Sequence, residues 1–318
     1  MSSRSDYKYT YTVFTPSYNR AHLLPRVYEC LEKQTFRDFE WLVVDDGSKD
    51  NTKEVVEQLR AKASFPVRYV AKPNGGKPSA VNRGAQEAEG QFLAILDSDD
   101  WYKPEALERF LHHWQSIPAD KQTQFVGVTG LCCLPSEEMI GDRFPQDIFD
   151  SDAIDLRYRH KVSGEKSGMI RTEVIQQFPY PEDLGKYVSE SLVWNRIAKQ
   201  YKTRFINEVL TVKEFQPGGI TLDGRALQVR NTRASLLSAK ELMQLGGRLP
   251  LAPRVRAYSN YVRHSLHQGI PLSQQRKGAP SQVMLYLCYP LGVYLKTSDA
   301  RAVKAKAATT NSAIETSS

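Results

Sequence analysis

The sequence contains few cysteines, and their spacing excludes the common cysteine-based sites. Four cysteines in 318 residues show no paired spacing of the zinc-binding kind: Cys30, Cys132, Cys133 and Cys288. Cys132 and Cys133 are adjacent, and neighbouring side chains on a strand point to opposite faces, so the two would not chelate one ion. We therefore expect buried or free thiols in a reducing compartment rather than a metal cluster or a disulfide framework.

Long apolar runs are also missing. The N-terminal stretch MSSRSDYKYTYT lacks the apolar core of a signal peptide, so export is not predicted and a cytoplasmic location is expected. The longest apolar run near the other end, residues 283–295, is too short to span a bilayer and contains Pro290. This run is expected to be either a core segment or an interfacial one.

Acidic residues are scarce in the last third of the chain. The formal net charge is +7, and from Arg225 onward there are 14 Lys and Arg against 3 Asp and Glu, so the preceding residues are slightly acidic. The basic residues alternate with apolar ones, which favours an anionic membrane surface, at the inner face of a cytoplasmic membrane, or a phosphate-bearing lipid as partner. A solvated helix face is the alternative. No recognised nucleic-acid motif accompanies the charge, so nucleic acid is not predicted as a partner.

The first hundred residues alternate between strand-like and helix-like segments. This order predicts an α/β fold of the Rossmann-like type, with a mainly parallel mixed sheet flanked by helices. The expected strands are residues 9–15, 39–45, 65–71 and 92–97, and the expected helices are 22–34, 51–63 and 77–90.

The rest of the chain is less regular. Further expected elements are a helix after Pro104, a strand over 124–134 and an amphipathic helix from residue 189. We expect three regions: a catalytic domain over 1–220, a basic helical C-terminal extension over 221–300, and a disordered tail over 301–318.

Each of the four predicted strands ends in a polar cluster. The clusters are PSYNR, DDGSKD, KPNGGK and DSDD. In parallel sheets ligands bind beyond the carboxyl ends of the strands, so these four loops are expected to form one rim.

The last cluster places three carboxylates, Asp97, Asp99 and Asp100, on four consecutive positions. Such crowding is costly unless a cation or a shared proton relieves it. An EF-hand loop fails because its sixth position needs Gly and this chain has Tyr102 there. An aspartyl-nucleophile phosphatase is disfavoured by the bulky Trp101. A hard-cation site that holds a nucleotide diphosphate is the third interpretation.

The four clusters together resemble the successive motifs of family-2 inverting glycosyltransferases, which have the GT-A nucleotide-sugar fold. The quoted residues are TPSYNR, VVDDGSKDNT, NGGKPSAVNRG and ILDSDDW, and the resemblance extends over about residues 9–215. It implies a nucleotide-diphosphate-sugar donor, with a UDP-sugar favoured, and a Mn²⁺ or Mg²⁺ ion. It also implies direct displacement onto a hydroxyl of a carbohydrate or lipid-linked glycan acceptor.

The resemblance also implies individual roles. Tyr18 and Asp46 correspond to base-binding positions, with Pro16, Arg20 and Asp45 in the same two motifs. Lys77 follows two glycines at a helix start, where it is suited to a phosphate, and Asn82 and Arg83 lie where the family contacts the nucleotide. Asp97 corresponds to a ribose ligand and Asp99 to the metal ligand, with Ser98 between them and Asp100 as a neighbouring or turn acid.

An inverting displacement needs a base. The segment VSESLVWNRIAK fits the family's base-bearing helix, with Glu190 four residues before Trp194, although the usual Glu-Asp pair is Ser-Glu here. Glu182 and Asp183 are the weaker alternatives. Acceptor contacts are expected from residues 130–185, where His160 is one candidate. Two other interpretations stay open: a nucleotidyltransferase, and a non-catalytic nucleotide-sugar-binding protein.

Overall fold

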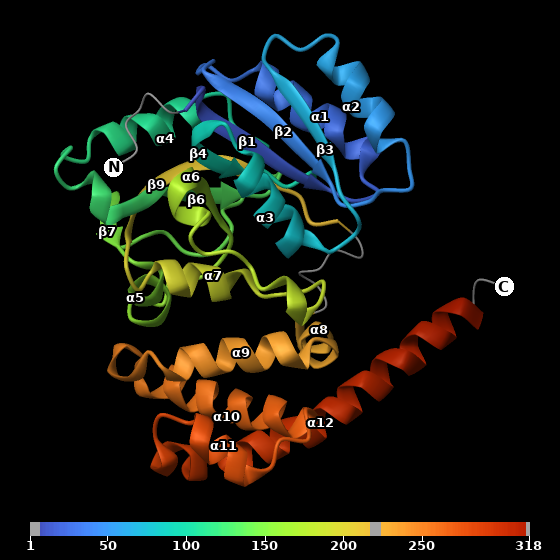
Figure 1. Ribbon diagram of the computed structural model, residues 1–318, viewed down its shortest axis with the longest axis vertical. Helices are drawn as coiled ribbons and strands as arrows, with labels where there is room; N and C mark the ends of the chain where they lie inside the picture. Colours follow the sequence, from blue (N-terminus) through green and yellow to red (C-terminus); the bar gives the residue numbers. More distant parts are fainter. Residues whose placement is uncertain (1–6, 217–223, 316–318) are drawn as a thin grey trace. The chain divides into compact units, whose positions relative to one another are not determined.

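The computed structural model describes residues 7–216 and 224–315, and these divide into two compact units (Figure 1). Unit 1 comprises the described residues up to Glu182 together with Val193–Gln216. Unit 2 comprises Asp183–Leu192 together with the described residues from Gly224 onward. The sequence-based domain boundary at 220/221 lies in the segment between residues 216 and 224, and the short Asp183–Leu192 segment was not expected to belong with the C-terminal helices.

Half of the sheet in unit 1 is parallel, as the alternating pattern predicts. It consists of β1 (Tyr9–Ser17), β2 (Phe39–Asp45), β3 (Val67–Ala71) and β4 (Gly90–Ile95), in the order β3-β2-β1-β4. Ser17 pairs with Asp45, and Asp45 with Ala71, so the carboxyl ends of three strands lie level with one another. The predicted rim of loops therefore exists along this edge.

The other half of the sheet is mixed, and the sequence predicted only one of its strands. β4 continues to β8 (Lys166–Arg171), β6 (Phe125–Cys133), β9 (Lys202–Lys213) and β5 (Asp100–Tyr102), while β7 (Ile148–Ser151) pairs with β9. Only β6 and β9 are parallel among these pairs. β5 and β7 are too short to show a periodicity, and β8 contains Gly168, whose Cβ position is filled by the backbone of β6.

Helices cover both faces of the parallel strands. The side chains of α1 (Leu24–Glu32), α2 (Thr52–Arg60) and α4 (Ala106–Gln115) share one core with alternate residues of the sheet, including Trp41. α3 (Lys77–Glu87) packs against the other face, where Gly84 lies directly on the ring of Phe14. Shorter helices are α5 (Ala153–Tyr158), α6 (Thr172–Ile175) and α7 (Glu190–Ile197). All four cysteines are buried and free, as predicted.

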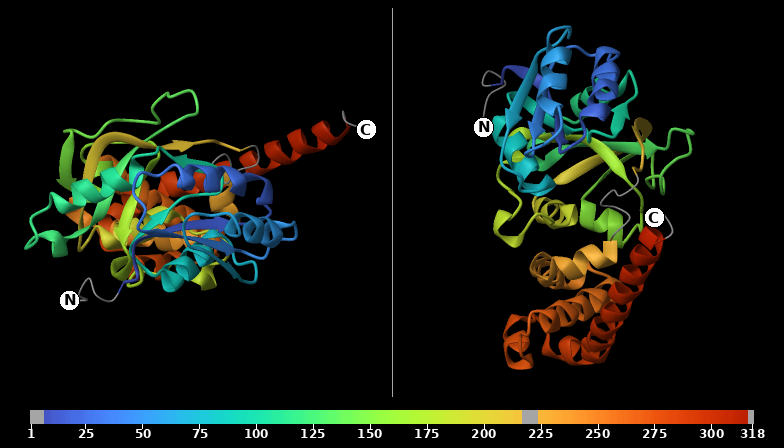
Figure 2. Two further views of the ribbon diagram at one scale, coloured as in Figure 1. Left: turned by 90° about the horizontal axis from the view of Figure 1, so that it is seen from above. Right: turned by 90° about the vertical axis from the view of Figure 1, so that its right-hand side faces the viewer.

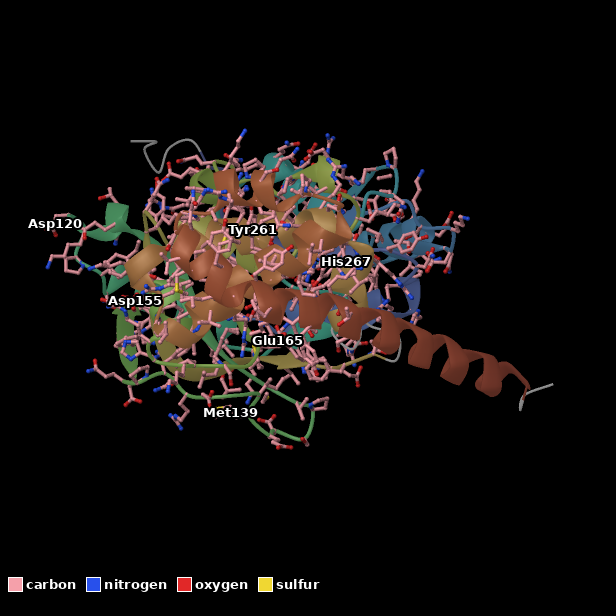
Figure 3. All side chains as sticks on the ribbon, turned by 90° about the horizontal axis from the view of Figure 1, so that it is seen from below. Asp120, Met139, Asp155, Glu165, Tyr261 and His267 are labelled. Carbon is pink, nitrogen blue, oxygen red and sulfur yellow. The ribbon has the colours of Figure 1, made fainter. Side chains whose placement is uncertain are left out.

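Unit 2 consists of helices in the residues that the structure describes. They are α8 (Gly224–Arg230), α9 (Thr232–Met243), α10 (Leu251–His267), α11 (Leu272–Gly278) and α12 (Gln282–Glu315). α10 packs against both α9 and α12 (Figure 2). Tyr261 of α10 belongs to their apolar core (Figure 3).

A buried ion pair joins α10 to α12. The Arg263 guanidinium donates to both carboxylate oxygens of Asp299 at 2.6 and 2.7 Å, and His267 Nε2 lies 2.8 Å from the same carboxylate. Both Arg263 and Asp299 are buried. Removal of one partner would leave a buried charge uncompensated, so the pair fixes the register of the two helices.

The predicted C-terminal tail over residues 301–318 overlaps the end of α12 in the structure. α12 continues as one helix to Glu315, and residues 316–318 lie outside the described residues. The segment from Ala302 to Ala308 consists of Ala and Lys with one Val, and Ala and Lys have high helix propensity. The low hydrophobicity of this segment predicts disorder. In the structure the segment continues the helix α12, whose first half packs against α10.

Candidate functional site

The loops after β1 and β2 are joined by short hydrogen bonds. Asn19 adopts a left-handed conformation with φ of 52° and accepts from the Lys49 backbone N–H at 2.7 Å. Its own N–H donates to Ser48 Oγ at 2.9 Å, and Ala21 N–H donates to Asp50 at 3.0 Å. This arrangement leaves the ring of Tyr18 45% exposed at the rim, which suits a stacking partner for a base.

Asp45 and Asp46 are both buried, and each organises a different part of the rim. Asp45 accepts from the Ser48 N–H at 2.8 Å and from the Tyr69 hydroxyl at 2.6 Å. Burial, followed by the hydrogen bond to Asp45, raises the pKa of Tyr69, so this hydroxyl stays a donor.

The Asp46 carboxylate holds the loop after β3. It accepts from Lys72 Nζ at 2.6 Å, Gly75 N–H at 2.9 Å and Gly76 N–H at 2.7 Å, and the Asn74 amide is also within 3.2 Å. The sequence assigns this carboxylate to a base N–H by resemblance, whereas the structure commits both oxygens to backbone and side-chain donors of the loop. Asp46 therefore shapes the glycine loop.

The glycines are required by this close packing. Gly47 has φ of +80°, and a Cβ there would lie 2.9 Å from the Asn74 backbone nitrogen. Gly76 has φ of 87° and precedes α3, whose N-terminus has no side-chain cap. The uncapped helix start next to Lys77 is suited to an anionic ligand.

The three carboxylates that follow β4 are each paired with a different basic side chain. Lys77 Nζ lies 2.9 Å from Asp97, Arg20 Nη1 lies 3.1 Å from Asp99 Oδ2, and Lys213 Nζ lies 2.5 Å from Asp100 Oδ2. The bases come from the loop after β1, from the start of α3 and from the end of β9. The structure thus joins the predicted residues Arg20, Lys77, Asp97 and Asp99 in one cluster.

Burial and charge act against each other in this cluster. Burial alone would raise the pKa of Asp97, but Lys77, Lys213 and Arg20 outweigh it and hold that pKa below its usual value. Burial raises the pKa of Asp100 to about 7, opposed by Lys213 and reinforced by Asp97 and Asp99. The pKa of Lys213 is raised because the two carboxylates outweigh the effect of its own burial. Lys213 therefore stays charged, and it compensates both carboxylates.

A fourth basic side chain, Arg26, contacts the turn. The Arg26 guanidinium donates to the Asp99 carbonyl at 2.8 Å, pairs with Glu214 at 2.8 Å and stacks 4.3 Å above the Trp101 ring. Trp101, whose bulk argued against a phosphatase, therefore packs against the Arg26 guanidinium. Since the cluster lies between two strands, β4 and β5, an EF-hand loop is excluded.

The donor chemistry of the cluster fits a hard divalent cation held together with a ligand. Asp97 and Asp99 supply only oxygen donors, and both side chains are about one quarter exposed. Among the described residues there is no group of three or more His, Cys, Asp or Glu side chains that would hold an ion unaided. Mg²⁺ is typically bound by one or two carboxylates plus substrate phosphates, which is compatible with this set.

Other predicted residues have structural contacts. The Asn82 amide donates to the Tyr180 carbonyl at 2.9 Å and to Glu182 at 2.7 Å, and accepts from the Tyr180 N–H at 2.8 Å. Asn82 thus ties α3 to residues 180–182. Arg83 pairs with Glu87 at 2.7 Å on the same helix. Pro16 is half-buried within β1 and Ser98 is buried in the turn.

The residues considered for the catalytic base fall in both units. Glu190 is the first residue of α7, is exposed and belongs to unit 2. Asp183 also belongs to unit 2, where Arg233 lies 4.0 Å away, whereas Glu182 belongs to unit 1. His160, a candidate acceptor contact, lies against the Phe149 ring at 4.9 Å and is exposed.

Three basic residues of the site were not predicted. Lys72 is the first residue of the KPNGGK cluster, so its position at the end of a predicted strand could have identified it as a site residue. Arg26 is on α1, one turn after the TPSYNR motif. Lys213 is 113 residues from Asp100 in sequence, and no local pattern marks it.

Comparison with known proteins agrees with this arrangement. The profile of Glycosyl transferase family 2 matches residues 12–128, which contain every loop of the rim. An uncharacterized glycosyltransferase of Mycoplasma pneumoniae is 38% identical over 112 residues, 34% of this chain and 37% of the relative. A GalNAc(5)-diNAcBac-PP-undecaprenol beta-1,3-glucosyltransferase of Campylobacter jejuni is 26% identical over 220 residues, 66% of this chain and 67% of that one.

The fold extends the likeness beyond the matched segment. TarS residues 1–349 of Staphylococcus aureus, solved in complex with UDP-GlcNAc, align with a TM-score of 0.58 at 17% identity, covering 93% of this chain and 92% of that one. The chain spans little more than a third of the length of the Mycoplasma relative. The profile match and the ordered motifs place residues 12–128 in glycosyl transferase family 2, and the shared architecture extends the GT-A fold over most of the chain.

Proposed function

We propose that the protein is an inverting glycosyltransferase that moves a sugar from a UDP-type nucleotide sugar to a hydroxyl of a glycan or lipid-linked glycan acceptor. The observation that carries the proposal is the set of three ion pairs, Asp97–Lys77, Asp99–Arg20 and Asp100–Lys213, at the carboxyl edge of the parallel strands. It gathers carboxylates for a ribose and a cation, and basic groups for a diphosphate, in one place.

The donor would bind across the loops that follow β1, β3 and β4. Tyr18 offers an exposed ring for the base, and the uncapped start of α3, which follows the Asp46-held loop, would receive the diphosphate. Lys77 and Arg20 each have a carboxylate partner here, and a diphosphate would compete for both of them. Each basic group then keeps a negative partner when the donor binds, so the exchange costs little desolvation.

The residues that would hold a Mn²⁺ or Mg²⁺ ion are Asp99 and, beside it, Asp97. When bound, the ion would supply positive charge to the leaving diphosphate. The chain's own residues contribute to the same end, because Lys77 and Arg20 are close enough to the acidic turn to neutralise a phosphate there.

The acceptor and the base complete the proposal. A carboxylate must take the proton from the attacking hydroxyl, and we propose Glu190 for this role because its segment resembles the family's base-bearing helix and Glu190 begins α7. A lipid-linked acceptor is favoured because the Campylobacter jejuni relative is named for an undecaprenol-linked substrate. We also propose a peripheral position at an anionic membrane, in keeping with the basic C-terminal third.

A panel of nucleotide sugars tests the proposal, with binding measured in the presence and absence of Mn²⁺ and product analysed after incubation. Metal-dependent binding of a UDP-sugar, with release of UDP on addition of a glycan, is the expected result. Release of pyrophosphate from a sugar phosphate and a nucleoside triphosphate would instead indicate a nucleotidyltransferase. Tight binding without turnover of any donor would indicate a non-catalytic binding protein.

A further inference from the structure

The first half of α12 is apolar on two opposite faces. No charged residue occurs over 282–295. One face, with Leu285 and Cys288, is buried in the core shared with α10. The opposite face is exposed, and a helix that is apolar all round is normally buried on all sides. We call its large side chains the α12 strip: Val283 (69% exposed), Tyr286 (48%), Leu287 (71%), Leu291 (43%) and Tyr294 (64%).

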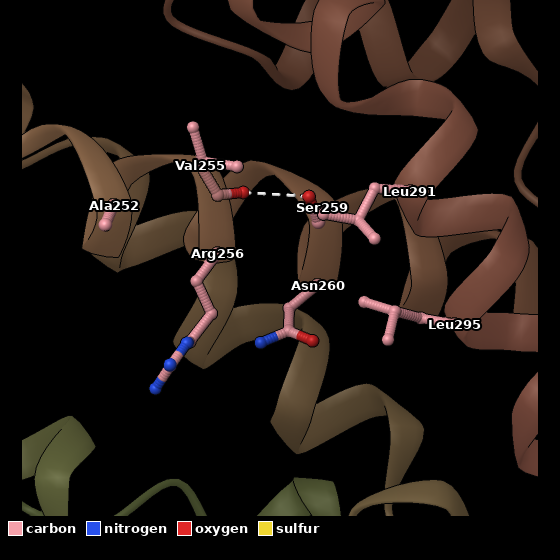
Figure 4. Close-up of a pocket in the computed structure, with 7 residues that line it drawn as sticks. All are labelled: Ala252, Val255, Arg256, Ser259, Asn260, Leu291 and Leu295. Atoms are coloured by element: carbon pink, nitrogen blue, oxygen red, sulfur yellow. Dashed lines mark hydrogen bonds between the residues drawn. The ribbon is translucent and has the colours of Figure 1, made fainter.

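The α12 strip continues into a groove on α10. A hollow of about 410 Å³ lies between the two helices, with Leu291 and Leu295 on one side and Ala252, Val255 and Arg256 of α10 on the other (Figure 4). Leu291 belongs to both the strip and the groove. The apolar surface is therefore wider than one helix face, and Arg256 places a positive charge at its edge.

The charge around this surface has a single sign. Residues 251–298 include six Lys and Arg and no Asp or Glu. Arg256, Arg276, Lys277 and Lys296 are exposed. The next acidic residue, Asp299, is buried and is neutralised by Arg263, so it does not offset them. An apolar strip in a segment whose charged residues are all cations is complementary to acyl chains beneath anionic headgroups.

A second copy of the chain fits this surface less well. Two strips in contact would bring two sets of uncompensated cations together, and like charges across an interface oppose association.

A bilayer-spanning role fits no better, because no helix within the described residues is long and apolar enough to cross a membrane. The charge-free part of α12 measures only about 20 Å along its axis.

We propose that the α12 strip docks unit 2 on the surface of an anionic phospholipid bilayer. α12 then lies in the plane of the interface, with Leu287 and Leu291 among the acyl chains and the hydroxyls of Tyr286 and Tyr294 at headgroup level. Arg276 and Lys277 of α11 and Lys296 of α12 contact lipid phosphates. The inference rests on the proposed membrane location, to which it gives a defined surface, and it does not depend on sugar transfer.

Vesicle sedimentation of the full chain tests the inference. Binding to vesicles of phosphatidylglycerol and phosphatidylcholine is expected to exceed binding to pure phosphatidylcholine by tenfold or more. Leu287→Glu replaces an apolar side chain that is proposed to enter the acyl region with a charged one, so it is expected to lower the partition coefficient by about tenfold or more. Ile148→Glu is the matched control: Ile148 is 46% exposed on β7 of unit 1, and its change is expected to leave binding unaltered.

A second variant tests the electrostatic part separately. Replacing Arg276 and Lys277 with Gln is expected to reduce the preference for anionic vesicles by about fivefold per charge while leaving the α12 strip intact. Sedimentation velocity and UDP binding are measured on every variant. Equal binding to neutral and anionic vesicles, wild-type binding by Leu287→Glu, or a dimer that only Leu287→Glu dissociates would overturn the inference. A variant that loses vesicle binding but binds UDP normally shows that the docking surface and the donor site are tested independently of each other.

Discussion

Lys213, the last residue of β9, lies directly opposite Asp100, the first residue of β5, and its Nζ is 2.5 Å from Asp100 Oδ2. The same ammonium is 3.9 Å from Asp97 Oδ2. One buried cation therefore compensates two carboxylates of the acidic turn. Strand β9, in the mixed half of the sheet, thus supplies a side chain to the turn that follows β4 of the parallel half.

Replacement of Lys213 by Met is expected to destabilise the fold by about 3 kcal/mol, because it leaves Asp100 buried without its partner. Urea unfolding at pH 7 measures the effect. Lys213→Arg keeps the charge and should recover most of the loss, and Lys202→Met, at an exposed position on the same strand, serves as the control. A loss below about 0.5 kcal/mol for Lys213→Met would show that the pair contributes no more than a surface ion pair.

Asp46→Asn tests whether this residue holds the loop or reads the base. The amide nitrogen of Asn would replace one carboxylate oxygen and face either the Lys72 and Gly75 donors or the Gly76 donor, so the loop should loosen. We expect a loss of about 2 kcal/mol in stability and a similar loss of affinity for every nucleotide tested. A folded variant that loses affinity for uridine nucleotides alone would instead assign Asp46 to the base. Asp120→Asn, an exposed acid (Figure 3), is the control.

The parallel half of the fold could be predicted because its signals are local. Expected strand 39–45 coincides with β2, and the expected start of the helix at residue 77 coincides with that of α3. Each strand is an apolar run followed by turn residues, and parallel strands place those turns on one edge. The association of Arg20, Lys77, Asp97 and Asp99 follows from that geometry alone.

The remaining features depend on contacts between distant segments. Lys213 reaches Asp100 only because β9 pairs with β5, and a 3-residue strand such as β5 gives no periodic signal. The hydrogen bond from Asn82 on α3 to the Tyr180 carbonyl was not predicted, and the role of Asn82 at the nucleotide stays a prediction. A motif gives the residue and its spacing, whereas the direction of the side chain depends on packing.

Asp99→Asn tests the metal site. The substitution keeps the shape of the side chain but removes the charge that binds a hard cation. We expect Mn²⁺-dependent UDP binding to be abolished with the fold intact, measured by calorimetry with and without Mn²⁺ and by circular dichroism. Asp120→Asn should bind as the unmodified protein does. Unchanged metal-dependent affinity in a folded Asp99→Asn variant would remove Asp99 from the metal site.

We predict that the fold loses stability in acid because of Glu208, a residue outside the proposed donor site. The hydrogen bond from Arg109, opposed by burial and reinforced by His113, lowers the pKa of Glu208 from 4.5 to about 2. A depressed folded-state pKa stabilises the fold above the unfolded value, and this contribution is lost as pH falls from about 4.5 toward about 2. Glu208→Gln should therefore cost about 2 kcal/mol at pH 7, allowing for partial exposure, and nothing near pH 2.

Denaturant unfolding of both proteins between pH 2 and 7 measures this difference. Glu137→Gln is the matched control, since Glu137 pairs with Lys103 at 2.8 Å but is 68% exposed. Its effect should stay within about 0.5 kcal/mol at every pH. A constant difference between Glu208→Gln and the unmodified protein across the pH range would show that packing rather than charge gives Glu208 its effect.

Glu190→Gln tests the catalytic base. Gln keeps the shape and much of the hydrogen bonding of Glu but cannot accept the proton of an acceptor hydroxyl. Positioned general bases contribute about 10² to 10⁴ in rate, so sugar transfer is expected to fall by about 10² or more. Donor binding should stay near normal, because the nucleotide contacts proposed above come from residues 16–99 and not from α7.

The same substitution at the two rival acids makes the assignment specific. Glu182→Gln replaces the charged acceptor of the Asn82 amide with a neutral amide oxygen, so it should lower stability slightly while leaving the rate per folded enzyme within a few-fold of normal. Asp183→Asn changes an exposed side chain, and its transfer rate should be normal. If Glu190→Gln transfers sugar at a rate within a few-fold of the unmodified enzyme, Glu190 is not the base. The base is then Glu182 or Asp183, whichever substitution lowers the transfer rate. Rates measured at saturating donor separate this effect from weaker binding.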